Sequence, residues 1–366
     1  MRMTRPDNTV HPFDRYTHVM RGVLIALLLG VVGASPALAQ RRLVVIDQDA
    51  AGPAGSDQMS MLALLQSKQV DVLGITIVTG DVWRDEGVQH TLRMLELTGH
   101  GDVPVVPGAV FPLVRTQEET RLAAQYNGKV AYLGAWNDGG HGPFEVPPLV
   151  EGSSRITPLA EDAAHFLIRQ VHAHPRQVTI FAAGPLTNVA LALAIDPTFA
   201  ESTSGIVIMG SSLNPQTDDP EFATSPRFEF NFWFDPEATR RVLRAHWPRI
   251  DVTTVDVSIK TKLTAQMFDA VARASSPAAQ YIAKYETERG YMWDEIAACA
   301  WLDPSVITKT RDLYMDVDVG HGSSYGYTLT WDEQLKPAVD VQLVHAQVDL
   351  DVAKFSRMFV DLMSNR

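Results

Sequence analysis

The sequence predicts an α/β protein built on an open, mostly parallel, doubly wound sheet. Helices should cover both faces, and the C-terminal part should add helices and small β elements. Two observations carry this prediction. Short apolar runs alternate with amphipathic segments from residue 42 to 257, which is the rhythm of βαβ units in a sheet buried on both sides. The apolar runs also end in clusters of Gly, Asp, Asn and Pro, as strands that lead into turns do.

Short runs rich in apolar and β-branched residues, bounded by turn residues, are typical of buried strands. They predict strands at Arg42–Ile46, Val70–Val78, Val103–Val106, Gln177–Phe181, Gly205–Met209, Val252–Val257, Leu313–Val317, Gly326–Thr330 and Val339–Val348. Helical spacing predicts helices at Gln58–Ser67, Asp85–Leu97, Ala160–His174, Leu186–Ala194, Asp235–Ala245 and Asp351–Met363, and mainly helix over 262–302. The irregular stretch Ala109–Arg155 is too long for a simple connection, so we expect a lid or binding loop there.

The first 39 residues have the pattern of a secretory signal peptide. Arg21 precedes the apolar run 23–32, which is too short to span a bilayer, and Ala37-Leu38-Ala39 is a small-residue cleavage site. We expect cleavage after Ala39, a periplasmic or secreted protein, and one domain over residues 40–366. No stable membrane anchor should remain after cleavage; an uncleaved anchor is the alternative.

Composition limits the partners and the chemistry. The formal net charge is −12, which argues against nucleic-acid binding because that needs a basic surface. Neutral nucleosides are not excluded. The single cysteine, Cys299, permits no internal disulfide, and its apolar surroundings predict a buried thiol rather than a nucleophile.

Two carboxylates stand at the C-terminal end of the first predicted strand, in Val44-Val45-Ile46-Asp47-Gln48-Asp49. Ligands bind at that edge of open α/β sheets. Side chains at i and i+2 share a face of a strand, so Asp47 and Asp49 can converge, with Asp57 following a loop rich in Gly and Ala. Carboxylates in a dry crevice repel one another unless a cation lies between them, and oxygen ligands favour Ca²⁺ or Mg²⁺. Taken alone, the pattern also fits a solvated turn.

Further polar groups follow buried strands or begin helices: Thr79-Gly80-Asp81, the AGPLTN segment 183–188, Glu229-Phe230-Asn231 and Trp293-Asp294. With VVIDQD, IVIMG and the DPEA after Asn231, these motifs make the chain resemble calcium-dependent nucleoside hydrolases of the inosine-uridine-preferring type. The resemblance covers essentially the whole mature chain, and GPLTN followed by EFN-x-x-x-DPEA is its most specific part. It implies an enzyme that uses Ca²⁺ to hydrolyse the N-glycosidic bond of a small nucleoside. We also expect a homo-oligomer.

The resemblance implies a role for each matching residue. Asp49 would bind the metal and act as the general base, and the other metal ligands would be Asp57, Asp294 and the backbone carbonyl of Ala183. Ca²⁺ takes about six to eight oxygens, so this set leaves room for a ribose diol and a water. The expected substrate contacts are Asp47, Ser56, Asp81, Met209, Glu229, Asn231 and Trp293, with Glu229 and Asn231 on the ribose hydroxyls.

The chain departs from the family pattern in two places. The loop between Asp49 and Asp57 is longer, and Ser56 stands where a ribose-binding aspartate is expected, which puts recognition of the diol in doubt. Trp293 stands where inosine-uridine-type members carry the histidine that acts as general acid. Trp293 and Asp81 are instead similar to the residues of the purine-preferring branch, where a Trp stacks on the base. Core filler is the alternative for Trp293. Candidates in the long loop are Trp136, Tyr132 or Tyr126 for a second aromatic wall and His141 for protonating the base.

Three functions are therefore compatible with the sequence. The first is an exported hydrolase that prefers purine ribonucleosides. The second is a hydrolase of the same fold that acts on another N-glycoside, because Ser56 replaces a diol ligand. The third is a non-catalytic periplasmic protein that binds a nucleoside or sugar with Ca²⁺. Retention of Asp49, a carboxylate that is costly to keep beside others, argues against the third.

Overall fold

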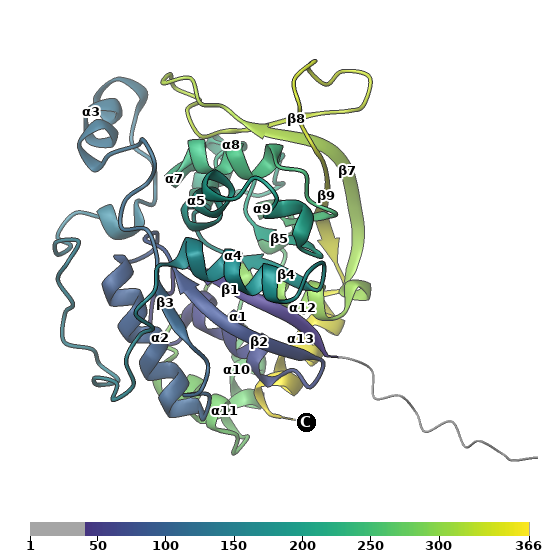
Figure 1. Cartoon of the computed structure of the whole chain (residues 1–366). Helices are drawn as coiled ribbons and strands as arrows, with labels where there is room; N and C mark the ends of the chain where they lie inside the picture. Colours follow the sequence, from purple (N-terminus) through teal and green to yellow (C-terminus); the bar gives the residue numbers. More distant parts are fainter. Residues whose placement is uncertain (1–40, 366) are drawn as a thin grey trace, which may run out of the picture. The chain divides into compact units, whose positions relative to one another are not determined.

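A nine-stranded sheet runs through residues 41–365, the part of the chain that this computed structural model describes (Figure 1). The expected signal peptide lies outside the described residues. The strands stand in the order β3-β2-β1-β4-β5-β6-β9-β7-β8. Neighbours are parallel from β3 to β9, whereas β7 runs antiparallel to both β9 and β8. The predicted doubly wound sheet and its later β elements are therefore confirmed.

The strand bounds agree best with the predictions in the parallel part of the sheet. They are β1 Arg42–Gln48, β2 Val70–Ile77, β3 Val105–Pro107, β4 Val178–Ala182, β5 Gly205–Met209, β6 Ile250–Thr253, β7 Ile307–Val317, β8 Thr328–Trp331 and β9 Leu343–Leu350. The prediction for Val252–Val257 was wrong in its second half, because Val255–Ser258 forms the short helix α9. The prediction for β7 missed residues 307–312, most of which are exposed and so lack an apolar pattern.

Helices cover both faces of the sheet, as expected (Figure 1). One face carries α1 Gly55–Gln66, α2 Arg84–Thr98, α10 Ala265–Ala272, α11 Pro277–Tyr285, α12 Trp293–Leu302 and α13 Val352–Met363. The other carries α4 Ala163–Ala173, α5 Thr187–Ile195 and α8 Pro236–Arg244. The helix predicted from Asp235 is preceded by the separate turn α7, Phe230–Phe234, and the mainly helical stretch 262–302 is confirmed.

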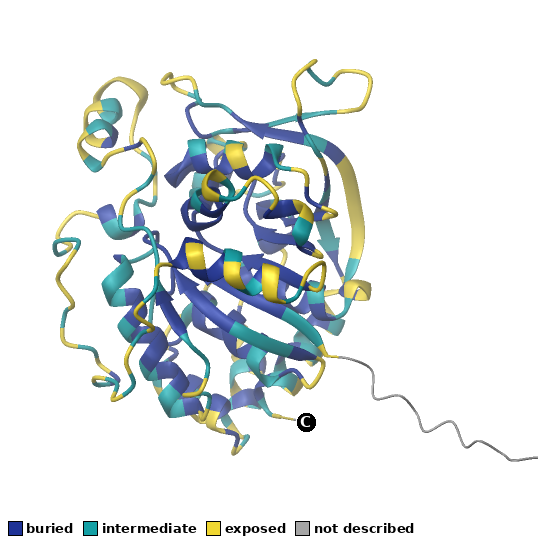
Figure 2. Ribbon diagram, in the orientation of Figure 1, coloured by how far each residue is buried: buried dark blue, intermediate teal, exposed yellow. Residues whose placement is uncertain are grey.

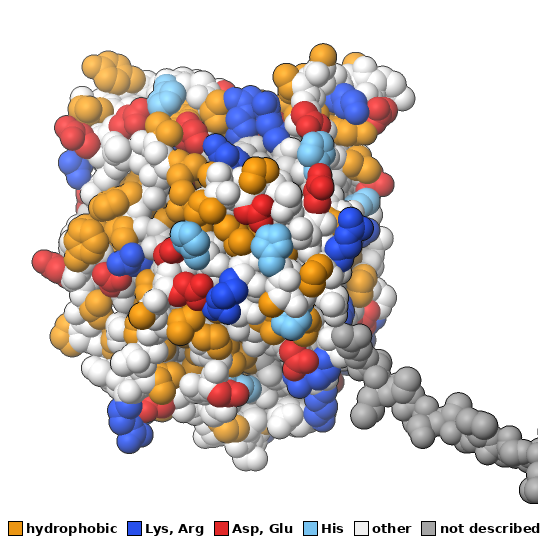
Figure 3. All heavy atoms as spheres, in the orientation of Figure 1, with side chains coloured by type: hydrophobic (Ala, Val, Ile, Leu, Met, Phe, Trp, Pro, Cys, Tyr) orange, Lys and Arg blue, Asp and Glu red, His pale blue; other side chains and the backbone are white. Residues whose placement is uncertain are grey.

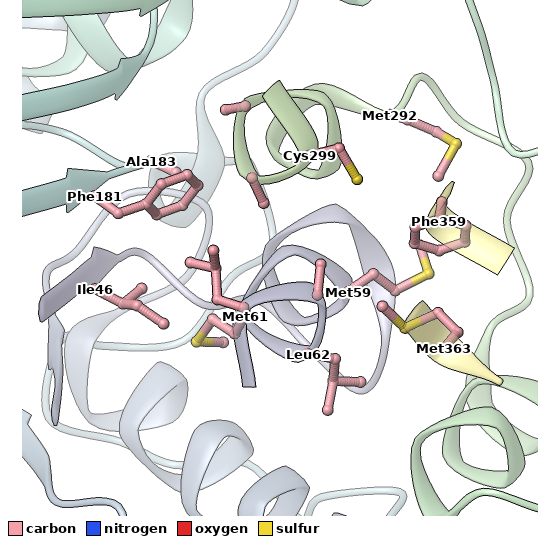
Figure 4. Close-up of a cluster of buried hydrophobic side chains, with 14 of the residues drawn as sticks. Ile46, Met59, Met61, Leu62, Phe181, Ala183, Met292, Cys299, Phe359 and Met363 are labelled. Atoms are coloured by element: carbon pink, nitrogen blue, oxygen red, sulfur yellow. The ribbon is translucent and has the colours of Figure 1, made fainter. Parts of the chain in front are cut away.

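Each face has its own hydrophobic core. Figure 2 shows the central strands and the inward sides of the helices buried, with exposure on the outer faces of the helices, in the loops and along the first half of β7. In the core under α1 and α12, Cys299 lies among Met59, Met292 and Phe359 (Figure 4). Its thiol is buried and free, and burial raises its pKa. The expectation of an inert buried thiol is confirmed, since a thiol that stays protonated is a poor nucleophile.

The stretch Ala109–Arg155 is mostly irregular, but it contains a helix that the sequence analysis missed: α3, Gln117–Asn127. Thr116 caps it by accepting a hydrogen bond from the Glu119 amide at 3.1 Å. The T-x-x-E spacing is a capping signal that is visible in the sequence. The helix was missed because Thr120 is its only buried residue, so it has no apolar stripe. It is followed by η1, Gly134–Trp136.

The same stretch exposes many large apolar side chains, including Phe111, Tyr126, Phe144 and Val150. Figure 3 shows hydrophobic side chains at the surface on the side where this segment runs in Figure 1. Within residues 41–365, no helix is long and apolar enough to span a bilayer.

The strand order decides where a ligand can bind. The chain leaves β1 toward β2 on one side, and β4 returns on the other side of β1. The loops after β1 and β4 therefore diverge and open a crevice at their carboxyl ends, as at the switch point of other doubly wound sheets. The remaining elements, α6 Pro220–Thr224, η2 Ala200–Ser202 and η3 Pro304–Val306, lie in connections.

Candidate active site

Asp49 lies directly after β1, in the crevice between the ends of β2 and β4. It is 2% exposed. Its Oδ2 accepts a hydrogen bond from the Asp81 amide at 2.9 Å. A Cβ on Gly80 would stand 2.1 Å from this oxygen, and one on Gly184 would stand 2.9 Å from Oδ1. The two glycines are therefore needed to let the neighbouring loops close around the carboxylate.

Asp57 and Asp294 meet from two different helices. Asp57 lies in the first turn of α1 and Asp294 in the first turn of α12. The two carboxyl groups are within hydrogen-bonding reach of each other. Asp57 Oδ2 also accepts from the Ala51 amide at 2.6 Å, which pins the loop after β1. Helix N-termini carry partial positive charge, so both helices favour a carboxylate at this point.

Gln48 connects this pair to the strand. Its side chain is fully buried; Nε2 donates to Asp294 Oδ2 at 2.9 Å, and Oε1 accepts from the Asp49 amide at 3.0 Å. One amide side chain thus fixes Asp49 and Asp294 relative to each other.

Asp81 completes the cluster from the end of β2. The Tyr132 hydroxyl hydrogen-bonds its carboxylate, so the long loop reaches the site through this tyrosine. Burial, together with the charges of Asp57 and Glu229, raises the pKa of Asp81. The Tyr132 ring packs edge-on against Phe230, with 4.9 Å between ring centroids.

The four carboxylates repel one another. Burial, followed by the charges of Asp81, Asp57 and Asp294, raises the pKa of Asp49 well above its usual range. Burial raises the pKa of Asp57 to about 6, and burial with the Asp57 charge raises that of Asp294. No Lys, Arg or His among residues 41–365 forms an ion pair with any of them.

Buried charges without a counter-ion are costly, and an all-oxygen donor set fits a hard divalent cation. The fit is not that of a closed cage, because no three acidic, His or Cys side chains within the described residues are drawn together at metal-binding spacing. The carboxylates instead form two close units, Asp49 beside the Asp81 amide and Asp57 beside Asp294.

Asp47 is separate from this cluster. Its Oδ1 accepts from Thr76 Oγ1 at 2.5 Å and from Asn188 Nδ2 at 2.8 Å, and its buried Oδ2 has no partner. Burial raises its pKa to about 7, and none of the other acids contributes to that shift. Asp47 therefore ties β1 to β2 and α5. Ala183 follows β4, and its amide donates to the Asp47 carbonyl at 2.9 Å.

Glu229 and Asn231 lie at the start of α7. Glu229 caps the helix: its carboxylate accepts from the amides of Asn231, Phe232 and, at 3.0 Å, Ser211. Burial nevertheless raises its pKa to about 7. Asn231 Nδ2 donates to the Met209 carbonyl at 3.2 Å, which joins the end of β5 to this pair. The field of Glu229 reaches Asp81, so this group borders the carboxylate cluster.

Ser56 points at α12. Its hydroxyl donates to Glu295 Oε2 at 2.6 Å and accepts from the Asp294 amide at 3.1 Å. The side chain thus caps α12 and links it to α1. Its hydrogen bonds fix the start of α12, where Asp294 lies.

Trp293 is half-buried at the first position of α12, next to Asp294. Its ring contacts Tyr291 and Phe222, with centroids 5.1 Å and 5.7 Å away. It therefore stands in an aromatic group at the start of α12, next in sequence to Asp294, and also packs against the core under this helix. The ring is less enclosed than a core residue, which leaves part of it available to a ligand.

The loop candidates Trp136 and His141 have their side-chain contacts with groups other than the four carboxylates, although the Ala135 amide next to Trp136 donates to the Gly80 carbonyl at 2.8 Å. Trp136 is buried against Phe234, with 4.3 Å between centroids. His141 Nε2 pairs with Glu86 on α2 at 2.9 Å. Among the loop aromatics, Tyr132 reaches the site and Tyr126 is exposed.

Gln48 and Glu295 were not predicted as site residues from the sequence. Glu295 is fully buried on α12, where it bonds Ser56, and burial raises its pKa to about 8. The polar Gln48 in an otherwise apolar strand was a visible signal. Nothing near Glu295 in the sequence distinguishes it from an ordinary acid in the first turn of a helix.

Comparisons with known proteins agree on one family. The model of the inosine-uridine preferring nucleoside hydrolase family matches residues 44–357. The chain is 29% identical to the probable uridine nucleosidase 2 of Arabidopsis thaliana, over 75% of this chain and 82% of that protein. It is 27% identical to the pyrimidine-specific ribonucleoside hydrolase RihA of Citrobacter koseri, over 86% and 95%. A purine-preferring ribonucleoside hydrolase from Gardnerella vaginalis shares the fold, with a TM-score of 0.69, 22% identity, and coverage of 88% and 98%.

Proposed function

Because this chain belongs to the inosine-uridine preferring nucleoside hydrolase family, and is thus an enzyme that cleaves the N-glycosidic bond of nucleosides, we propose that it is an exported, calcium-dependent hydrolase of purine ribonucleosides. The observation that carries the calcium dependence is the cluster of the buried Asp49, Asp57 and Asp294 with the half-buried Asp81, none of which has an ion-pair partner in the described part of the chain. Because the chain belongs to a family of enzymes, the third interpretation, a non-catalytic binding protein, is no longer favoured.

Asp49, Asp57, Asp294 and the Ala183 carbonyl would hold the cation. When bound, Ca²⁺ would supply a hard positive charge that neutralises these carboxylates and attracts the oxygens of water and the ribose diol. Asp57 and Asp294 are presented by two helix N-termini, and Gln48 and Ser56 keep them in register. On binding, the two units of the cluster would close around one cation.

The reaction breaks the bond between the sugar C1′ and the base nitrogen and adds a hydroxyl from water to C1′. Asp49 is the proposed general base, which takes a proton from that water and contributes roughly 10²–10⁴-fold to the rate. Positive charge develops at the sugar ring in such reactions, and carboxylates around the site stabilise it. The leaving base keeps the electron pair of the broken C1′–N bond and takes up a proton, so that the free base and ribose are released.

Glu229 and Asn231 are the proposed contacts to the ribose hydroxyls. Glu229 already accepts three amide hydrogen bonds, so its position is fixed before substrate arrives, although a carboxylate can accept about four. Met209 and Asp81 border the same space. Asp47, bonded to Thr76 and Asn188, supports the floor of the site.

Trp293 supports the purine preference, because a partly open indole ring beside the cluster offers a large stacking surface to a bicyclic base. A second candidate is uridine, favoured by the named activities of the plant and bacterial relatives. Ser56 faces α12 rather than acting as a free diol ligand, which also keeps another N-glycoside among the possible substrates.

One experiment tests the activity, the metal and the base together. The mature protein is assayed with inosine, adenosine, guanosine and uridine, in excess Ca²⁺ and after EGTA treatment. We expect release of free base that is lost in EGTA and restored by Ca²⁺, with the highest kcat/KM for a purine nucleoside. Full activity in EGTA would overturn the calcium proposal, and a higher kcat/KM for uridine would move the preference to pyrimidines.

The export proposal is tested on the protein itself. Signal peptidase should cleave after Ala39, so N-terminal sequencing of the exported protein should begin at Gln40. Recovery of the intact leader in a membrane fraction would show that the leader is an anchor.

A further inference from the structure

A second cavity lies outside the carboxylate cluster. It measures about 770 Å³ and is enclosed by α3 and the chain that follows it, by α6, and by residues 321–327. Its walls include the aromatic residues Trp136, Phe228, Trp233, Tyr325 and Tyr327. None of the four site aspartates, Glu229, Asn231 or Trp293 lines it. This size is within the range of pockets that bind small molecules.

Arg115 forms part of the wall and is only 6% exposed. Its guanidinium lies between two rings, 4.5 Å from the Trp233 centroid and 4.0 Å from the Tyr325 centroid. It donates one hydrogen bond, from Nη2 to the Tyr325 carbonyl at 3.1 Å, while Nε has no partner. No ion pair to Arg115 occurs within residues 41–365.

An arginine in this position remains charged. Burial lowers its pKa to about 10, partly offset by Tyr325 and nearby acids. Glu237, Glu119 and Asp235 compensate the charge only at a distance, since no carboxylate of the described residues lies within ion-pair reach, so an anionic ligand would supply the direct partner that a buried cation favours. The two stacked rings hold the guanidinium plane in place, and a fixed planar fork is suited to an oxyanion.

Two other buried groups in the wall also lack a partner. The Trp136 indole Nε1 donates to no acceptor, and Thr120 Oγ1 has no hydrogen bond. An indole N–H is a donor only, so Trp136 and Arg115 both require an acceptor. Around the rim, Arg121 and Lys129 are outnumbered by Glu119, Asp138 and Glu221. The rim therefore does not attract anions in general, so the ligand must be selected by the buried groups of the wall.

We propose that this cavity is a second binding site, which takes a small molecule with an aromatic ring and an oxyanion, either a phosphate ester or a carboxylate. The oxyanion pairs with Arg115 and accepts from the Trp136 indole, and the ring packs among the aromatic side chains. The site is independent of the hydrolytic reaction. Tyr132 and Phe230, packed edge-on, stand at its boundary with the carboxylate cluster, since Leu133 and Phe228 beside them line the cavity.

Phenyl phosphate and benzoate are the probes, because each joins a ring to one kind of oxyanion. Calorimetry on the full-length mature protein should give 1:1 binding for at least one of them, and the stronger of the two identifies the oxyanion. Phenol and inorganic phosphate, the separate halves of phenyl phosphate, should bind at least tenfold more weakly. No turnover is involved, so a failed nucleoside assay leaves this measurement intact.

Arg115→Met keeps the length and packing of the side chain but removes its charge, and should weaken binding at least tenfold. Trp136→Phe keeps a ring but removes the donor, and should weaken it several-fold. Arg121→Met is the matched control, since Arg121 is exposed on the same cavity, and should leave affinity unchanged. If Arg115→Met does not fold, Arg115→Lys should fold and bind several-fold more weakly.

Three outcomes would overturn the proposal. The first is that neither probe binds the wild-type protein at millimolar concentration, and the second is that binding is undiminished in both the Arg115 and Trp136 variants. The third is that inosine or uridine displaces the probe from the catalytically impaired Asp49→Asn protein, because the cavity would then be part of the nucleoside site.

Discussion

Two clusters of buried and half-buried acidic side chains lie near the loop between β1 and α1, and they differ in how their charge is balanced. In the first, Asp49, Asp57, Asp81 and Asp294 have no protein cation beside them among the described residues. In the second, Glu86 on α2 and Glu151 at the end of the long segment surround His90. His141 pairs with Glu86 as well, so the second cluster supplies its own cations.

The difference separates a reactive site from a structural one. The hydrogen bonds of His90 to Glu151 and Glu86 outweigh the effect of burial and raise its pKa to about 9. The protonated ring therefore fastens the end of the long segment to α2. The aspartates have no such partner, and their repulsion persists in the folded protein. Natural proteins keep such strain mainly where function requires it.

The largest expected effect comes from Asp49→Asn. Loss of the general base should lower kcat by roughly 10²–10⁴-fold or more. Folding should not suffer in EGTA, because the raised pKa of Asp49 means that its ionisation opposes folding above the unfolded value near 3.8. Thermal unfolding at pH 7 in EGTA should give a Tm equal to or above that of the wild type. An inactive variant with a clearly lower Tm would show that Asp49 is a structural residue.

His90→Gln should have the opposite effect on stability. The folded-state pKa of about 9 lies above the usual 6.5, so the stabilisation is complete below about pH 6.5 and is lost as the pH rises through 9. The shift corresponds to about 3 kcal/mol. Urea unfolding at pH 6 should give His90→Gln a free energy of unfolding lower than that of the wild type by about this amount. At pH 9.5 the two proteins should differ little.

His165→Gln is the matched control, because His165 pairs with Asp162 at the surface. Exposed pairs contribute at most about 1 kcal/mol. A His90 variant that is equally destabilised at both pH values would point to lost packing instead of lost charge.

The sequence predicted the parallel core of the fold and much of the site, because both depend on local patterns. β1 to β5 follow from apolar runs, and the start of α12 at Trp293 is confirmed. The convergence of Asp47 with Asp49 did not follow from strand alternation. β1 ends at Gln48, and Thr76 and Asn188 hold Asp47 elsewhere.

Contacts between distant residues were not predictable. Gln48 and Asp294 are 246 positions apart, and no local pattern links them. Ser56 was expected at the diol, but its direction is set by Glu295 on α12. The charged end of the long segment was also missed, since the partner of Glu151 is His90, 61 positions away in the sequence.

Calcium should stabilise the first cluster and leave the second unaffected. At a free concentration 100 times its Kd, a ligand that binds only the folded state adds about 2.7 kcal/mol. The Tm of the wild type should therefore rise on titration from EGTA into Ca²⁺, and that of Asp57→Asn should rise much less. His90→Gln should show the full calcium shift from its lower starting Tm. Equal shifts in the wild type and Asp57→Asn would place the calcium outside this cluster.

The smallest expected effect is on base selection. Trp293 borders the unneutralised cluster with its ring partly open, next to Phe222 and Tyr291. Stacking contributes roughly 1–3 kcal/mol per base and depends on ring area, so a purine should lose more than a pyrimidine when the indole is removed. Trp293→Ala should therefore narrow the ratio of kcat/KM for inosine over uridine by up to about tenfold. Trp136→Ala is the control, since that ring is buried against Phe234 outside the cluster and should leave the ratio unchanged. An unchanged ratio in Trp293→Ala would make Trp293 a packing residue and leave base selection to the loop around Tyr132, whose hydroxyl is bonded to Asp81.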